Sequence, residues 1–208
     1  MNRSALNVQK PIDSIKNLSI FFEKLSILLS AEDWFGPSVS REAIESYFKK
    51  YFTIFWNRFF LMQIPFLMRW KIIFGDLESW VIWANIAINQ SSNLEKNYKG
   101  KYNNIFITSY REEKKNKENL FINKVQDTIP DIGVNASSIS DISGIPRATV
   151  MRKLNKLLKE NVIIRNKKLE YFLKKEGKLN KEITNNYEIN QKYSILFITD
   201  IFNLIKKS

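Results

Sequence analysis

The 208-residue sequence contains no cysteine and no histidine, and it has only six glycines. Without cysteine there are no disulfides and no thiol nucleophile, and without both residue types the usual zinc sites are excluded. Ser-His-Asp triads and histidine acid–base catalysis are excluded as well. So few glycines argue against a Gly-rich phosphate loop, and no nucleophile motif or catalytic carboxylate pair is recognisable. We therefore expect a protein that is not an enzyme and has no metal or cofactor.

The sequence also lacks a long uncharged hydrophobic run. Near the N-terminus the most apolar run, residues 18–29, is interrupted by Glu23 and Lys24, so no signal peptide is expected. The aromatic-rich stretch 47–74 contains five basic residues and leaves no uncharged run near the roughly 18–20 residues of a membrane span. A soluble, cytoplasmic protein is the expectation.

Positive charge is in excess and is concentrated in one region. The chain has 33 basic and 21 acidic residues, a formal net charge of +12. Such a surplus favours a polyanionic partner, nucleic acid first and an acidic membrane surface second. A genome-wide bias towards lysine would spread the charge evenly, but residues 147–178 hold eleven basic and three acidic residues, which is +8 of the +12. The charge therefore points to a nucleic-acid interface in this region.

Residues 1–110 have the pattern of a helical domain. Apolar residues recur at helical spacing, which predicts helices over residues 12–30, 41–63, 66–74 and 77–90. The break between the second and third helix is placed at Pro65, because a residue before proline disfavours helical backbone. The polar, Asn- and Lys-rich stretch 91–104 is expected to be a loop and a weak domain boundary.

Two of the predicted helices are unusually apolar. Helix 41–63 is apolar around most of its circumference, and a C-terminal helix, 190–206, is apolar on adjacent faces. Exposed apolar surface of that extent normally marks an interface, so we expect a homodimer held by the helical parts. The alternative is that the two helices bury each other within one chain. The aromatic residues of 47–83 fit a core or a dimer interface, and a pocket for a small-molecule effector is the other interpretation.

From about residue 118 the pattern becomes specific. A first helix is expected to end near Pro130, and a short strand is expected at 131–134. Asn135 is a good N-cap for a short helix over residues 136–143. The next three residues, Gly-Ile-Pro, predict a tight turn, because glycine tolerates left-handed backbone and proline suits the first turn of a helix.

A basic helix and a hairpin complete this module. The helix is predicted over residues 146–161, and apolar runs at 162–165 and 169–173 around a short polar turn are typical of a hairpin. The stretch 139–158 (ISDISGIPRATVMRKLNKLL) resembles the helix-turn-helix of bacterial winged-helix transcription regulators, and these residues match: Gly144, Ile145, Thr149, Val150, Arg152 and Leu154. Ser140 departs from the pattern, since such motifs usually have alanine there.

The resemblance covers residues 118–177, and residues 1–110 resemble no family. The expected fold is therefore mainly α. A helical domain spans 1–110, a winged helix-turn-helix module with α+β structure spans 111–177, and a C-terminal helix lies in 178–208. That last helix is expected to pack on the helical domain or on a partner subunit.

The resemblance implies double-stranded DNA as the partner. A helix fits the major groove, where base edges present distinct donor and acceptor patterns. The candidates for base contacts are outward residues of helix 146–161: Arg147, Thr149 and Arg152. The candidates for phosphate contacts are hydroxyl or basic residues around it: Ser137, Ser138, Lys153, Lys156, Arg165, Lys167 and Lys168.

The function expected from these features is sequence-specific transcription regulation. The alternative is a winged-helix module that binds protein or RNA without specific DNA readout. We favour DNA, because such modules usually lack a basic second helix and a basic wing together.

Overall fold

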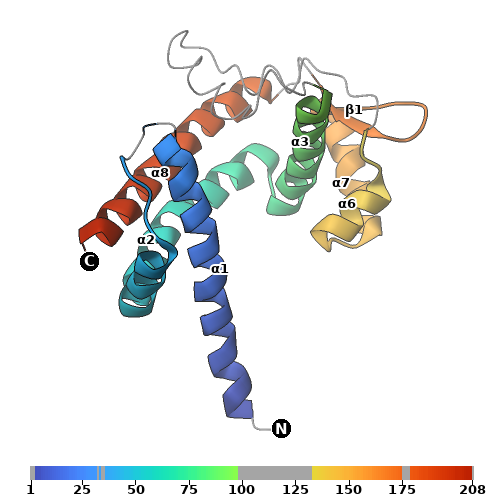
Figure 1. Ribbon diagram of the computed structural model, residues 1–208. Helices are drawn as coiled ribbons and strands as arrows, with labels where there is room; N and C mark the ends of the chain where they lie inside the picture. Colours follow the sequence, from blue (N-terminus) through green and yellow to red (C-terminus); the bar gives the residue numbers. More distant parts are fainter. Residues whose placement is uncertain (1–2, 32, 34–35, 98–132, 175–178, 208) are drawn as a thin grey trace. The chain divides into compact units, whose positions relative to one another are not determined.

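The computed structural model describes residues 3–31, 33, 36–97, 133–174 and 179–207. The chain is mainly helical and has a small two-stranded antiparallel sheet (Figure 1). The elements in chain order are α1 (Arg3–Ala31), α2 (Arg41–Phe74), α3 (Leu77–Asn97), α6 (Ala136–Ser143), α7 (Arg147–Lys159), β1 (Ile163–Arg165), β2 (Tyr171–Leu173) and α8 (Asn180–Lys207). The helix expected near 118–130 lies outside the described residues, as do residues 131 and 132 of the expected strand.

The chain divides into two compact units, and each is described by itself. The three-helix unit comprises Met1–Pro65 and Gln191–Ser208, and the helix–hairpin unit comprises Phe66–Asn190. This division differs from the boundary expected near residue 110. Helix α3 belongs to the same unit as α6, α7 and the hairpin, and α8 contributes to both units.

Aromatic rings form the core of the three-helix unit. The ring of Phe22 on α1 meets the rings of Phe48 and Phe55 on α2 edge to face, at centroid distances of 5.4 and 5.9 Å. It meets Phe202 of α8 at 5.7 Å, and Arg58 of α2 forms an ion pair with Asp200 of α8. The apolar faces of α2 and α8 thus bury each other within one chain. A homodimer no longer follows from their apolar pattern alone.

Several helices differ from the expected bounds, among them α8, which begins at Asn180 rather than at residue 190. Helix α2 continues through Pro65 to Phe74, and its departure from helical backbone lies at Tyr51 (φ −120°, ψ 28°). Proline removes one N–H from the helical ladder, but the residues after Pro65 resume the pattern. Helix α1 begins at Arg3 rather than near residue 12, and α3 reaches Asn97 instead of ending near residue 90. Part of the expected loop 91–104 is therefore helical, in keeping with the helix formers Leu, Glu and Lys at 94–96.

The helix–hairpin unit is built around α3. Its buried residues Ile82, Trp83 and Ile86 pack in one cluster with the buried faces of α6, α7 and the hairpin, and α3 contacts α6, α7 and β2 directly. Figure 1 shows α3 beside α6 and α7. The other buried apolar residues of this cluster include Ile139, Val150, Leu154, Leu157, Tyr171 and Leu173. Helix α3 therefore covers the buried faces of α6, α7 and the hairpin.

The elements after Asn135 agree closely with the prediction. Helix α6 has the expected bounds, while α7 ends at Lys159, two residues before the expected end. Strands β1 and β2 pair antiparallel, with Ile164 opposite Phe172. Val134 forms an isolated antiparallel bridge to Tyr171 on the other edge of β2, so backbone pairing does occur at the end of the expected strand 131–134.

Candidate nucleic-acid interface

The turn between α6 and α7 is held by short side chains. Asn135 caps α6, because its side-chain oxygen accepts a 2.9 Å hydrogen bond from the N–H of Ser138. Gly144 ends α6 in the left-handed region (φ 69°) and donates its N–H to the carbonyl of Ser140 at 2.9 Å. The hydroxyl of Ser140 then donates a 2.7 Å hydrogen bond to the carbonyl of Ile145. Ser140, which stands where the helix-turn-helix pattern of the resemblance usually has alanine, thus closes the turn.

Helix α7 has a buried face and an exposed ridge. Val150, Leu154 and Leu157 are buried in the core of the unit. The exposed residues lie on the opposite side and at the N-terminal end: Arg147, Ala148, Arg152, Asn155 and Lys159. Two expected base-reading residues, Arg147 and Arg152, are therefore exposed. Thr149 is only half-buried on the flank of the helix, one turn before Lys153.

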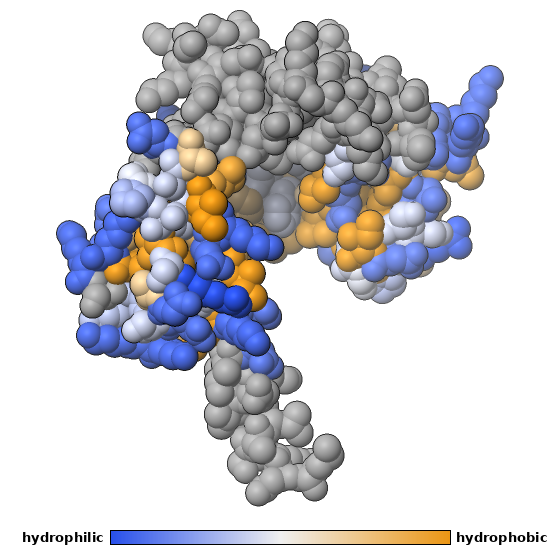
Figure 2. Space-filling model, in the orientation of Figure 1, coloured by the Kyte–Doolittle hydropathy of each residue, from blue (hydrophilic) through white to orange (hydrophobic). Residues whose placement is uncertain are grey.

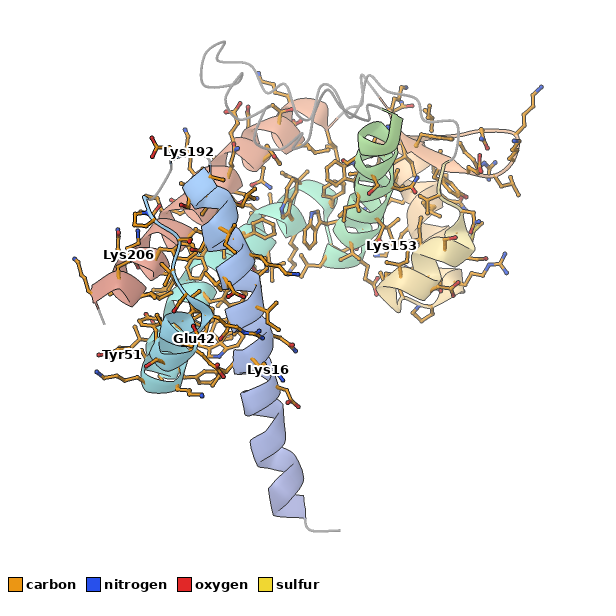
Figure 3. The ribbon with its side chains drawn as sticks, viewed as in Figure 1. Lys16, Glu42, Tyr51, Lys153, Lys192 and Lys206 are labelled. Carbon is orange, nitrogen blue, oxygen red and sulfur yellow. The ribbon has the colours of Figure 1, made fainter. Side chains whose placement is uncertain are left out.

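Lys153 and Lys156, two of the expected phosphate contacts, are bound within the unit. Nζ of Lys153 lies 2.8 Å from a carboxylate oxygen of Asp76 and 3.4 Å from one of Glu78, and only 12% of its side chain is exposed. Nζ of Lys156 donates a 2.7 Å hydrogen bond to the carbonyl of Phe74 and lies 3.6 Å from the same Asp76 oxygen. In Figure 3, Lys153 lies beside the N-terminal end of α3. Neither lysine is kept as a phosphate-contact candidate.

Asp76 holds these lysines while it caps α3. One of its carboxylate oxygens accepts the N–H of Ser79 at 2.7 Å, and the other accepts the Ser79 hydroxyl at 3.0 Å. Burial by itself raises the pKa of Asp76, but hydrogen bonds from Lys153 and Ser79 and the nearby Lys153 charge outweigh burial. Together they lower the pKa from 3.8 to about 2. The carboxylate is therefore ionised throughout the ordinary pH range.

The serines expected to contact phosphate lie in the first turn of α6. Ser137 is exposed and Ser138 is half-buried. The backbone N–H of Ser138 is already donated to Asn135, so Ser138 is retained as a candidate through its hydroxyl alone.

The hairpin carries the second group of exposed cations. Arg165 ends β1, and Lys167 and Lys168 lie in the turn, all exposed. The turn is closed by Asn166, whose side chain donates to the Glu170 carboxylate at 2.7 Å and accepts the Glu170 N–H at 2.9 Å. In Figure 2 this turn projects from its unit as hydrophilic surface. The hairpin therefore presents a fixed, basic tip.

On α7 and the hairpin that follows it, six basic residues form no ion pair within the part of the chain that the structure describes: Arg147, Arg152, Lys159, Arg165, Lys167 and Lys168. Lys153 and Lys156 are close to acidic groups and are the exception on α7. The exposed ridge and the hairpin tip can thus attract polyanions without first breaking an internal ion pair.

Sequence reasoning missed three residues of this region. Asn155 and Lys159 follow Arg152 at helical spacing, and that spacing would have placed them on the ridge. Asp76 is different, because it is remote in sequence from the lysines that it binds. Its cap on α3 is a local feature of the sequence, but nothing in the pattern indicated a second contact.

Comparison with known proteins identifies no relative: no family model, no curated protein and no solved structure matches this chain. Among the described residues, no helix is both long and apolar enough to cross a membrane. The same residues contain no group of three or more acidic side chains placed to hold a metal ion. The interface is therefore characterised by its own geometry.

Proposed function

We propose that this chain is a sequence-specific DNA-binding transcription regulator in which α7 enters the major groove. The observation that carries the proposal is the exposed ridge of α7, where Arg147, Arg152, Asn155 and Lys159 lie opposite the buried face. A helix of this kind fits the major groove. Arginine can bond both acceptors of guanine, and asparagine can bond the acceptor and donor of adenine. A ridge with both residue types is suited to reading base pairs.

The hairpin supports the same function as a winged element. It follows α7 directly in the chain, and its basic tip contains Lys167 and Lys168, with Arg165 at the end of β1. Contacts of such residues with phosphates add affinity and salt dependence but carry no sequence information. The hydroxyls of Ser137 and Ser138 at the start of α6 supply further phosphate contacts. Most of the phosphate contacts thus fall on other elements than the base contacts.

The test is the affinity of the chain for duplexes as a function of salt. If roughly six phosphates are neutralised, the affinity falls by about a thousandfold between roughly 50 and 200 mM salt. A duplex selected from a random pool and a scrambled version of it separate specific from general binding. Lys16→Gln is the matched control, because Lys16 is an exposed cation of the three-helix unit and lies outside the interface. No binding at low salt, or binding indifferent to salt, would refute the proposal.

The alternative function is binding of RNA or protein by a winged module. An RNA duplex has a deep, narrow major groove that a helix cannot enter, so α7 would lose its base contacts there. We therefore expect the selected DNA duplex to bind more tightly than an RNA duplex of the same sequence. Equal affinity for both would favour the alternative.

We propose further that the regulator acts as a homodimer. A single helix-turn-helix reads few base pairs, and a two-fold dimer doubles the site on a palindromic operator. Within the three-helix unit, α2 still exposes large apolar side chains after α8 has covered its other face: Ile54, Phe60, Leu61 and Ile64. Leu61 is 70% exposed. Apolar surface of this kind is suited to an interface between copies.

A further inference from the structure

The cations of α7 fall into two sets that differ in their surroundings. Arg152 and Lys159 lie on the exposed ridge and form no ion pair within the described residues. Lys153 and Lys156 lie on the flank and are held by the corner between α2 and α3. In the sequence the four residues look alike, since all are basic and all lie within two turns of one helix.

The acidic groups at this corner occupy the place that a phosphate would take. A lysine ammonium binds any anionic oxygen at the distance seen between Lys153 and Asp76, which is 2.8 Å. Glu78 lies 3.4 Å from the same ammonium, so two carboxylates compete with DNA for Lys153. Because 12% of the Lys153 side chain is exposed, a duplex would have to displace both carboxylates to reach it.

The same contacts fix how α7 is rotated about its own axis. The buried face sets the rotation only roughly, because apolar packing has no direction. Lys153 ties the flank of α7 to the capping residue of α3, and Lys156 ties it to the last carbonyl of α2. Rotation about the helix axis decides which side chains point into a groove. The contacts of Lys153 and Lys156 therefore determine that the ridge with Arg152 and Asn155 faces outward.

We propose that Asp76, aided by Glu78, is a positioning residue for DNA readout, which holds Lys153 and Lys156 away from phosphates and sets the rotation of α7. The inference rests on the proposed function of α7. It predicts that Lys153 contributes nothing to the salt dependence of duplex binding, in contrast to the ridge residue Lys159. It also predicts that a chain without the Asp76 charge binds duplexes of any sequence more tightly and loses its preference for the selected site.

The first experiment compares Lys153→Met with Lys159→Met in duplex binding from roughly 50 to 200 mM salt. Each cation that contacts a phosphate contributes about 0.9 to the slope of log affinity against log salt. We expect Lys159→Met to lower the slope by about that amount and Lys153→Met to leave it unchanged. Equal losses of slope in both variants would overturn the inference and leave the DNA function intact.

The second experiment uses Asp76→Asn, which removes the charge while asparagine still caps α3. Released lysines add phosphate contacts. Relative to the unaltered chain, each added contact should contribute about a further threefold to the rise in affinity for a scrambled duplex when salt is reduced from roughly 200 to 50 mM. The ratio of selected to scrambled affinity should fall. An unchanged ratio together with an unchanged slope would contradict the positioning role.

A third measurement does not depend on DNA. Asp76→Asn, Lys153→Met and the double variant are compared in thermal unfolding. If the two residues act through each other, the double variant loses no more in melting temperature than the more damaging single variant. Additive losses would overturn the contact. Absence of duplex binding by the unaltered chain would refute the proposed function alone, because the unfolding comparison still tests the contact between Asp76 and Lys153.

Discussion

The backbone N–H of Leu173 donates a 2.6 Å hydrogen bond to the side-chain oxygen of Gln90, and both groups are buried. On the same edge of β2, Tyr171 exchanges hydrogen bonds with Val134 at 2.9 and 3.4 Å. The other edge of β2 is paired with β1. Beyond the pairing with Val134, the side chain of Gln90 on α3 is therefore the acceptor on this edge of β2. It satisfies the N–H of Leu173, which would otherwise be buried without a partner.

Replacement of Gln90 by leucine should destabilise the helix–hairpin unit. Leucine has a similar size but accepts no hydrogen bond, so the N–H of Leu173 would be left unsatisfied at a cost of about 1–3 kcal/mol. The free energy of unfolding in urea measures this change. Asn185→Leu is the control, because Asn185 is exposed on α8 in the same unit, and it should change stability by less than about 0.5 kcal/mol. Similar effects of both substitutions would show that the bond to Leu173 contributes nothing.

Removal of ridge side chains should relax base preference. We expect Arg147→Ala, Arg152→Ala and Asn155→Ala each to reduce discrimination against one wrong base pair by about 1–3 kcal/mol. In contrast, Lys167→Ala and Lys168→Ala should weaken selected and scrambled duplexes alike, because phosphates are the same in both.

Competition between a selected and a scrambled duplex distinguishes these two classes of variant. The lysine variants serve as controls for the ridge variants, since both classes lose exposed side chains of the same unit. If all the ridge variants kept the original preference, α7 would not be the reading helix.

The charge of Asp76 should stabilise the fold above pH 4 and lose this effect in acid. Its pKa is lowered from 3.8 to about 2 in the folded chain, so the folded state favours the ionised form. Such a contribution is complete above the unfolded pKa and disappears as pH falls from about 4 to about 2. Asp76 is about one-third exposed, so we expect only about 1 kcal/mol at neutral pH because solvent screens the pair.

Unfolding free energies of the unaltered chain and of Asp76→Asn, measured between about pH 2 and 7, check this expectation. The difference between the two chains should be constant above about pH 5 and should vanish near pH 2. A difference that grew towards acid pH would contradict the lowered pKa.

Charge introduced into the exposed apolar surface of α2 should dissociate the proposed dimer. We expect sedimentation equilibrium of the unaltered chain at micromolar concentration to give twice the monomer mass of 24.6 kDa. Leu61→Lys would place a charge in that surface and should shift the mass to the monomer value, because a buried unpaired charge is costly. Lys49→Gln on the same helix is the control, and it should remain dimeric. A monomer mass for the unaltered chain at every concentration would exclude the dimer.

The segment from α6 to the hairpin could be predicted from the sequence because its determinants are local. The cap at Asn135, the left-handed Gly144 and the apolar spacing of α7 act over a few residues, so a linear pattern contains them. The clustering of positive charge is likewise a property of the chain alone. These features located α6, α7 and the hairpin, and they identified Arg147 and Arg152, which are both exposed.

Only the tertiary structure decided which cations are exposed and which helices cover each other. Lys153 and Lys159 are equivalent in the linear pattern, but Lys153 meets Asp76 of a distant segment and Lys159 does not. The mutual burial of α2 and α8, and the packing of α3 on α6 and α7, are also contacts between distant segments. Apolar periodicity shows that a face must be buried, but many partners can satisfy it. The partner is selected by the packing of the whole chain.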